Sequence, residues 1–321
     1  MFDHILVPLD GSLLAECVLP HVLAFAKATG AKITLLHVLD RESTRDSMGV
    51  VEPLEWFIRK AEAEIYQQAI FKRLSNTEVP VTTVITEGRA ADGIIQYARD
   101  QKVDLIAMSS HGLSGLRGWN ISSVVQKVLF RAYTSLLIVP AYLLRQMDLD
   151  VFHYKKVFVG LDGSQRAEWV LPHALRLIAY HQATLLLAHV VPGPEILPYQ
   201  SHGREEIEEI DRLAERKLHD AEIYINELYS RLIAGGYRVN TFIQTSENPI
   251  ETLRELVDQE GIDLVILSAH GCTGCFKRLY GSVTLSFIAY GNTPMLILQD
   301  LHASTIRLSQ AELASIQHAK H

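Results

Sequence analysis

Apolar positions along the chain alternate between short continuous runs and longer periodic segments. Runs such as residues 4–9 and 32–39 are continuous and rich in branched side chains, as is typical of strands buried on both faces of a parallel sheet. Between them, residues 54–74 repeat apolar side chains at helical spacing. The members of that predicted apolar face are Phe57, Ile58, Ala61, Ile65, Ala69 and Ile70. The alternation predicts an α/β fold with a doubly wound parallel sheet.

The same alternation occurs twice. The expected strands are residues 4–9, 32–39, 79–86, 103–108 and 135–139 in the first half, and 156–161, 184–191, 238–245, 262–267 and 294–298 in the second. The expected helices include residues 12–29, 54–74, 89–100, 205–234 and 283–290. Gly30 is expected to end the first helix, and Ser282 to cap the last one.

Local motifs repeat in the same order in the two halves. Leu9-Asp10-Gly11-Ser12 recurs 152 residues later as Leu161-Asp162-Gly163-Ser164. Ser109-Ser110-His111-Gly112 recurs 159 residues later as Ser268-Ala269-His270-Gly271, so the second half carries seven extra residues between its second and fourth strands. Colinear repeats predict a duplicated domain. We expect domains at 1–140 and 155–300, a linker at 141–154, and a tail at 301–321 that forms one short helix.

Composition narrows the class of protein. The chain of 321 residues is 48% hydrophobic, which is enough for two buried cores. Its net charge of −7, divided as −2 over residues 1–150 and −5 over residues 151–321, provides no basic field for nucleic acid. The chain start and the apolar run at 136–144 do not have the length of a signal peptide or a membrane span. Three cysteines, an odd number, favour a reducing cytoplasm.

Candidate chemistry lies where two strands of each half end. Asp10 and Asp162 follow the first strands, and the glycine loops at 109–112 and 268–271 follow the fourth strands. In a sheet ordered 3-2-1-4-5 these ends meet at the crevice where the strand order reverses, which is where ligands bind. A glycine loop before a helix start suits phosphate, while a carboxylate accepts from an amine or a ribose hydroxyl. The arrangement predicts a nucleotide.

These motifs resemble the universal stress protein family in its tandem form, across nearly all of residues 1–300. Its nucleotide-binding members carry Gly-x-x-Gly, nine residues, then Gly followed by Ser or Thr. Here Ser109 and Ser268 replace the first glycine, and Ser122 stands in the first half where the second has Gly281. The resemblance implies two Rossmann-like domains of five strands each, similar to the adenine nucleotide alpha hydrolases. It also implies that the fifth strands of the two halves face each other as an intramolecular pseudo-dimer.

By the same resemblance each half binds ATP, or AMP or ADP in its place, with Mg²⁺ held through the phosphates. Asp10 and Asp162 would face the adenine, beside the backbone of Val38 and Val190. The other implied contacts are Ser268, His270, Gly271, Gly281, Ser282, Val283 and Thr284 in the second half, and Ser109, His111, Gly112, Ser122, Ser123 and Val124 in the first. We expect tighter binding in the second half, because Gly281 permits close backbone approach and Thr284 adds a hydroxyl where Val125 has none.

Structural roles remain open for the same residues. The two aspartates are compatible with helix caps and the loop glycines with turns. His37 and His189 fit core histidines with a backbone partner, and His111 and His270 fit structural ones. The loop side chains Arg117, Lys277 and Arg278 either pair with phosphate or are solvated. Cys272 and Cys275 are compatible with a redox pair or with two small loop residues. A zinc site built on them and His270 would lack a fourth ligand. Cys17 is expected in the core.

The chain lacks the usual signatures of catalysis. It has no Gly-x-x-x-x-Gly-Lys-Ser/Thr loop, no Gly-x-Ser-x-Gly elbow and no His-Glu-x-x-His pair. Binding and signalling are therefore favoured over an enzyme. The leading prediction is a cytoplasmic ATP-binding stress-response protein whose nucleotide state alters its conformation or its protein partners. A slow ATP hydrolase and a nucleotide-free structural module are the alternatives, and formation of a homodimer stays open.

Overall fold

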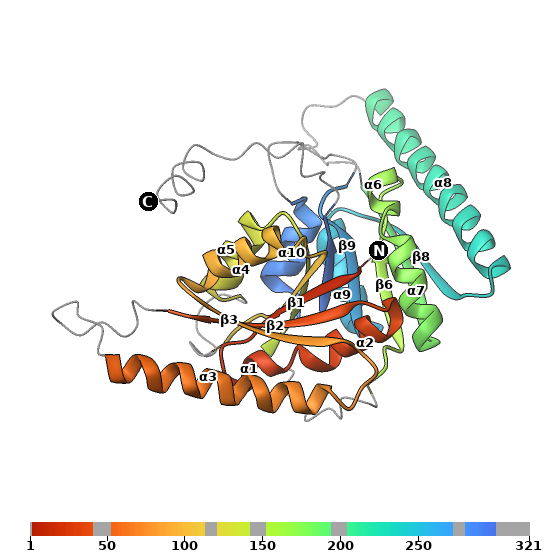
Figure 1. Cartoon of the computed structure of the whole chain (residues 1–321). Helices are drawn as coiled ribbons and strands as arrows, with labels where there is room; N and C mark the ends of the chain where they lie inside the picture. Colours follow the sequence, from red (N-terminus) through yellow and green to blue (C-terminus); the bar gives the residue numbers. More distant parts are fainter. Residues whose placement is uncertain are drawn as a thin grey trace.

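One sheet runs through the whole molecule. The computed structural model describes residues 2–40, 53–112, 121–141, 152–193, 204–271 and 280–299. Within these residues ten strands form a single sheet in the order β3-β2-β1-β4-β5-β10-β9-β6-β7-β8 (Figure 1). Each half has the strand order 3-2-1-4-5, so the predicted doubly wound α/β class is confirmed.

The first half follows the expected succession of elements. Its strands are β1 (His4–Pro8), β2 (Lys32–Leu39), β3 (Val81–Glu87), β4 (Leu105–Ser109) and β5 (Ser135–Val139). Its helices are α1 (Leu13–Glu16), α2 (Leu19–Thr29), α3 (Pro53–Leu74), α4 (Ala90–Asp100) and α5 (Ser123–Arg131). The single helix predicted over residues 12–29 is two helices, because Pro20 has no N–H for the preceding turn and stands in the first turn of α2 instead. Gly30 ends α2 as predicted, with φ 78°.

The second half repeats this succession. Its strands are β6 (Lys156–Gly160), β7 (Thr184–Pro192), β8 (Arg238–Ser246), β9 (Leu264–Ser268) and β10 (Met295–Leu298). Its helices are α6 (Gln165–Glu168), α7 (Leu171–His181), α8 (Arg204–Ala234), α9 (Pro249–Gln259) and α10 (Ser282–Tyr290). The observed strands start or end within two residues of the expected ones.

Helices cover both faces of the sheet. Buried side chains of α2, α3, α7 and α8 form one apolar cluster with strand residues such as Ile5 and Val7. Those of α4, α5, α9 and α10 form another cluster on the opposite face, with strand residues such as Leu6. Alternate residues of one strand therefore enter different cores, which explains why the strands read as continuous apolar runs.

The two halves join through their fifth strands. β5 and β10 pair antiparallel, with Leu137 opposite Leu296 and Ile138 opposite Met295. All other pairs of the described sheet are parallel. Each apolar edge strand is thus covered by the other half, as the family resemblance implied, and two five-stranded sheets become one.

Helix α3 forms where its periodicity predicted it, but only part of its predicted apolar face meets the sheet. Phe57 and Ile65 belong to the predicted apolar face, and their side chains are 67% and 69% exposed, whereas Ile70 of the same face is buried. The residues of α3 that are buried are Ala63, Gln67, Ile70 and Leu74. Apolar residues lie on two sides of this helix, and periodicity alone does not say which side meets the sheet.

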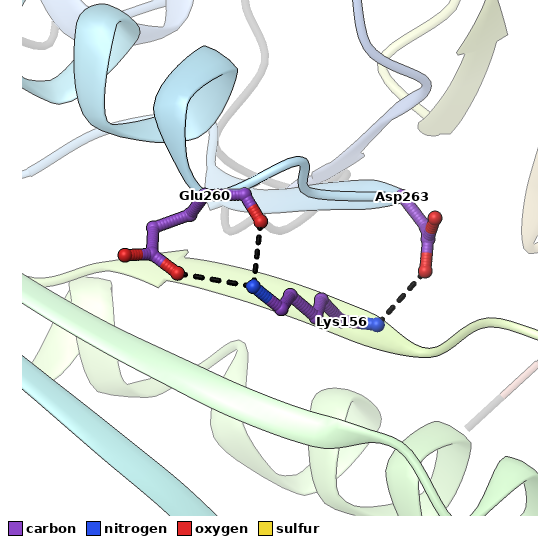
Figure 2. Close-up of polar contacts among 3 residues, drawn as sticks. All are labelled: Lys156, Glu260 and Asp263. Carbon is purple, nitrogen blue, oxygen red and sulfur yellow. Dashed lines mark hydrogen bonds and ion pairs between the residues drawn. The ribbon is translucent and has the colours of Figure 1, made fainter.

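An aspartate ties the amino ends of the central strands in each half. The Asp263 carboxylate accepts a hydrogen bond from the backbone N–H of Lys156 at 2.8 Å, and the Lys156 ammonium donates to the Glu260 carbonyl at 2.7 Å (Figure 2). In the first half Asp104 accepts from the backbone N–H of His4 at 2.9 Å. These bonds fix β6 beside β9 and β1 beside β4, which are the strands whose carboxyl ends carry the predicted site.

Candidate functional site

The predicted site residues gather where the central strand of each half stops. β1 ends at Pro8, which pairs with Leu36, while β2 continues to Leu39. β6 and β7 are staggered in the same way. The backbone of Val38 and of Val190 therefore extends past the central strand, beside the residues that follow it.

Asp10 and Asp162 each hold the serine that caps the next helix. Oδ1 of Asp10 accepts from the backbone N–H of Ser12 at 3.0 Å and from its hydroxyl at 2.6 Å. The Ser12 hydroxyl oxygen in turn accepts from the first turn of α1. Asp162 and Ser164 repeat both distances. The serines are thus the helix caps, and the alternative in which the aspartates cap the helices directly is wrong.

Gly112 and Gly271 lie directly against these carboxylates. A Cβ added to Gly112 would lie 2.0 Å from Oδ2 of Asp10, and one added to Gly271 would lie 2.2 Å from Oδ2 of Asp162. Neither glycine is among those with positive φ. Glycine is therefore required here by the close approach of the carboxylate rather than by a turn, and the ends of the first and fourth strands meet as predicted.

The serines at the position of the first family glycine close the loop. The hydroxyl of Ser109 donates to the carbonyl of His111 at 2.6 Å, and Ser268 makes the same bond to His270 at 2.5 Å. The two histidine side chains are 6% and 3% exposed. The structural interpretation of these histidines is favoured, since both residues are buried.

The helix starts differ between the halves. Ser122 is the N-cap of α5, and its hydroxyl oxygen accepts from the backbone N–H of Val125 at 3.3 Å. Gly281 is the N-cap of α10 and supplies no side-chain cap, so Ser282, expected as the cap, is the first helical residue. The backbone N–H groups of Ser122 and Gly281 donate to the loop carbonyl just after β4 and β9, at 2.7 and 2.8 Å. Both helix starts, including Ser123, Val124 and Val283, therefore lie beside the strand ends.

Thr284 faces the protein interior. Its hydroxyl donates to the carbonyl of Ser268 at 2.9 Å, and the side chain is 3% exposed. This bond uses the hydroxyl proton that we expected a phosphate to accept. The remaining difference between the halves is the side-chain cap at Ser122, which Gly281 does not provide. Packing does not require glycine at 281, since a Cβ there would have no contact closer than 3.7 Å.

A cluster of polar side chains around a tyrosine lies near each aspartate and is identical in the two halves. They are Glu16, His37, Tyr66 and Arg73 in the first half, and Glu168, His189, Tyr224 and Arg231 in the second. The rings of His37 and Tyr66 have centres 6.3 Å apart, and those of His189 and Tyr224 are 6.1 Å apart. Burial raises the pKa of Tyr66, and the charges of Glu16 and Asp10 add to this. Burial lowers the pKa of His37, although Asp10 opposes the shift.

The tyrosine, glutamate and arginine of this cluster were not predicted. Ala-Glu-Ile-Tyr at residues 63–66 recurs at residues 221–224, an offset of 158, and would have identified them. The offset also places six of the seven extra residues before this point of α8. Nδ1 of His37 and of His189 is buried without a hydrogen-bond partner among the described residues, so the expected backbone partner is not seen for that atom.

Cys17 lies against the core as predicted. Its side chain is partly buried, and burial raises the pKa of its thiol to about 11.

Other expectations receive no support or lie outside the described residues. The side chains of Arg117, Cys272, Cys275, Lys277 and Arg278, most of the linker and the tail at 301–321 are not described. In the described parts, His, Cys, Asp and Glu form no group of three that could hold a metal ion. No helix there is both long and apolar enough to cross a membrane.

Comparison with known proteins matches both halves. The sequence model of the universal stress protein family matches residues 1–140 and 153–299. Universal stress protein MJ0577 of Methanocaldococcus jannaschii is 29% identical over 154 residues, which cover 43% of this chain and 95% of that protein. Universal stress protein YxiE of Bacillus subtilis is 32% identical over 138 residues, covering 40% of this chain and 92% of that protein.

A solved structure shares the fold of nearly the whole chain. The crystal structure of a universal stress protein from Archaeoglobus fulgidus superposes with a TM-score of 0.65 at 17% identity, and covers 92% of this chain and 98% of that one. The curated relatives span less than half of this chain each, and the family's sequence model matches it twice. The chain therefore belongs to the universal stress protein family, in its tandem form.

Proposed function

We propose that each half binds an adenine nucleotide at the carboxyl end of its central strand, and that nucleotide binding alters the protein's conformation or partners in a stress response. The observation that carries the proposal is the contact between carboxylate and glycine, Asp10 with Gly112 and Asp162 with Gly271. In this proposal the carboxylate accepts from the exocyclic amine of adenine, or from a ribose hydroxyl, and the glycine belongs to the segment that precedes a helix start. The second site is the more open, since Asp162 is exposed and Asp10 is half-buried.

The helix starts supply the phosphate end of the site. α5 and α10 have nine residues each, long enough for a positive dipole end, and begin beside the strand-four loops. Among the described residues no side chain caps the start of α10, and in this proposal the backbone N–H of Thr284 donates to a phosphate oxygen. In α5 the equivalent N–H of Val125 is already bonded to Ser122. We therefore propose tighter nucleotide binding in the second half, with Mg²⁺ bound through the phosphates.

The proposal is for binding, not for catalysis. A hydrolase needs a base that reaches an attacking water. The histidines closest to the helix starts, His111 and His270, are enclosed in their loops. We further propose that residues 1–140 and 155–300 are two domains that share one sheet, that 141–154 links them and that 301–321 is a tail. A cytoplasmic location is also proposed, from the odd number of cysteines.

Ligand class is tested by recovery from a mixture. The purified protein is incubated with equimolar ATP, GTP, CTP and UTP and Mg²⁺, desalted rapidly and denatured, and the released molecules are identified by mass spectrometry. We expect ATP, or ADP or AMP derived from it, to be recovered in excess over the other three. Equal recovery of all four nucleotides, or recovery of none, would contradict the proposal. Steady phosphate release from the same sample, above a protein-free control, would favour the hydrolase instead.

A further inference from the structure

Helix α3 carries an apolar stripe on the side opposite the sheet. We call Leu54, Phe57, Ile58, Ala61 and Ile65 the α3 stripe. Leu54, Phe57, Ile58 and Ile65 are 70%, 67%, 48% and 69% exposed. Residues 54, 58, 61 and 65 are spaced four, three and four apart, which is the seam spacing of helices that pack along each other. At 100° per residue this seam lies opposite the buried residues 63, 67, 70 and 74.

The stripe lies mainly on a part of α3 that the rest of the described protein does not bury. None of residues 54–62 is buried, and Ala63 is the first buried residue after them. At 1.5 Å per residue, about 14 Å of helix precedes it. In Figure 1 α3 lies at the lower edge of the molecule, remote from α8. Contiguous exposed apolar surface of this kind marks an interaction site in soluble proteins.

Helix α8 shows that the fold does not require an apolar stripe at this place. The shared Ala-Glu-Ile-Tyr motif aligns α8 with α3 at an offset of 158. α8 likewise has no buried residue at 212–220, and Ala221, the equivalent of Ala63, is buried. The residues of α8 at the stripe positions are Arg212, Glu215, Arg216, His219 and Ile223. These two equivalent helices are thus similarly uncovered, but four of the five stripe positions are polar or charged in α8, whereas all five are apolar in α3.

Charges at the edges of the stripe select the kind of partner. Glu55 and Glu62 lie along one edge and Glu64 along the other, as the helical periodicity places them. Arg59 lies closer to the sheet side and pairs with Glu55 at 3.0 Å. A second copy packed antiparallel on the stripe would bring Glu55 towards Glu62 of the other chain, which is repulsive. The net charge of −7 also disfavours a second copy.

We propose that the α3 stripe binds an amphipathic helix of a partner protein that carries Lys or Arg along both sides of its apolar seam. Apolar side chains of the partner pack between Leu54, Phe57, Ile58 and Ile65, as in other complexes in which a helix binds along an apolar face. Basic side chains of the partner face the glutamates and determine which helix is accepted.

The test uses two synthetic helical peptides and the full chain. Both fluorescently labelled peptides have Leu at the seam positions; one has Lys at the flanking positions and the other has Glu. Binding is followed by fluorescence anisotropy to wild type, to F57K/I65K, and to L213K/I223K as the control on α8. Leu213 and Ile223 are 53% and 47% exposed, so the control changes similarly exposed apolar residues. We expect the Lys peptide to bind wild type at least about tenfold more tightly than the Glu peptide.

The variants decide between the outcomes. F57K/I65K should bind the Lys peptide about tenfold or more weakly than wild type does. It should melt like wild type, since both replaced side chains are exposed. L213K/I223K should bind the Lys peptide as wild type does. Equal binding of the two peptides, or equal loss in the two variants, would overturn the proposal. Sedimentation that showed a wild-type dimer and an F57K/I65K monomer would assign the stripe to a second copy, and would overturn it as well.

Discussion

Each site carboxylate has two oxygens with different neighbours. Oδ1 of Asp10 is bonded to Ser12, and Oδ2 lies against Gly112; Asp162 repeats both relations. The sequence placed aspartate and glycine at one crevice, because strand order and strand ends can be read from apolar runs. It did not show why glycine is needed, since the cause is a contact between segments about 100 residues apart. Thr284 shows the same limit, because its bond to Ser268 depends on how α10 packs on β9.

The cap difference between the halves can be exchanged. G281S should give α10 the cap that Ser122 gives α5, and weaken Mg-ATP binding in the second half by about tenfold, since a hydrogen bond to a charged group contributes about 1.5–3 kcal/mol. S122G should strengthen the first site and lower stability by only a few tenths of a kcal/mol. The backbone at both positions is alike, with φ −69° and −71°, so neither change strains the chain. Calorimetric titration of both variants measures this, and unchanged affinity in both would exclude the helix starts as the phosphate site.

At the scale of elements, the periodicity of apolar residues predicted which helices and strands exist and in what order, but predicted less well how they pack. β2 and β5 have the predicted limits, because a continuous apolar run bounded by polar residues is recognisable without tertiary information. One helix was predicted with the wrong limits, and another packs on a side that its pattern did not specify. Pro20 divides the first helix, and α3 turns its other apolar side to the sheet. The cluster around Tyr66 and Tyr224 was missed because a tyrosine within a helix has no distinguishing pattern, and only superposition of the halves shows that it is repeated.

At the scale of the whole molecule, aromatic and histidine side chains join the halves on the α2 and α7 face. His21 on α2 lies 2.7 Å from the Tyr154 hydroxyl, measured from Nδ1. His173, its equivalent on α7, has its ring centre 5.2 Å from that of Phe2. Each of these histidines thus meets an aromatic residue that precedes the first strand of the other half. Arg176 on α7 also donates a hydrogen bond from Nε to the carbonyl of Ala28 on α2, at 2.7 Å.

The buried histidines at this contact between α2 and α7 should make the protein sensitive to acid. Burial lowers the pKa of His21 to about 3, and burial together with His153 lowers that of His181 to about 4. Histidine in the unfolded chain has a pKa of about 6.5. The unfolded state therefore binds more protons once the pH falls below that value, and stability is lost down to the folded pKa. For His21 alone the loss between pH 6.5 and 4.5 is roughly 2 kcal/mol, because the slope reaches its full value of about 1.4 kcal/mol per pH unit only well below pH 6.5.

Urea unfolding at a series of pH values measures the loss. Wild type should lose free energy of unfolding steadily below pH 6.5, and H21Q should show a shallower dependence because glutamine does not titrate. H21Q starts from a lower stability at neutral pH, since it alters a buried contact with Tyr154. An identical slope in the two proteins would show that His21 does not carry the acid sensitivity.

The central claim is that the repeated carboxylate and glycine contact forms a nucleotide site in each half. Calorimetric titration of Mg-ATP into wild type, D10N, D162N and the double variant tests it directly. Asparagine keeps an oxygen for the serine that Oδ1 holds and removes the charge that the nucleotide would face. We predict a tight and a weaker binding event in wild type, loss of the tight event in D162N, loss of the weaker one in D10N, and no binding to the double variant. A double variant that binds Mg-ATP as wild type does would contradict the account.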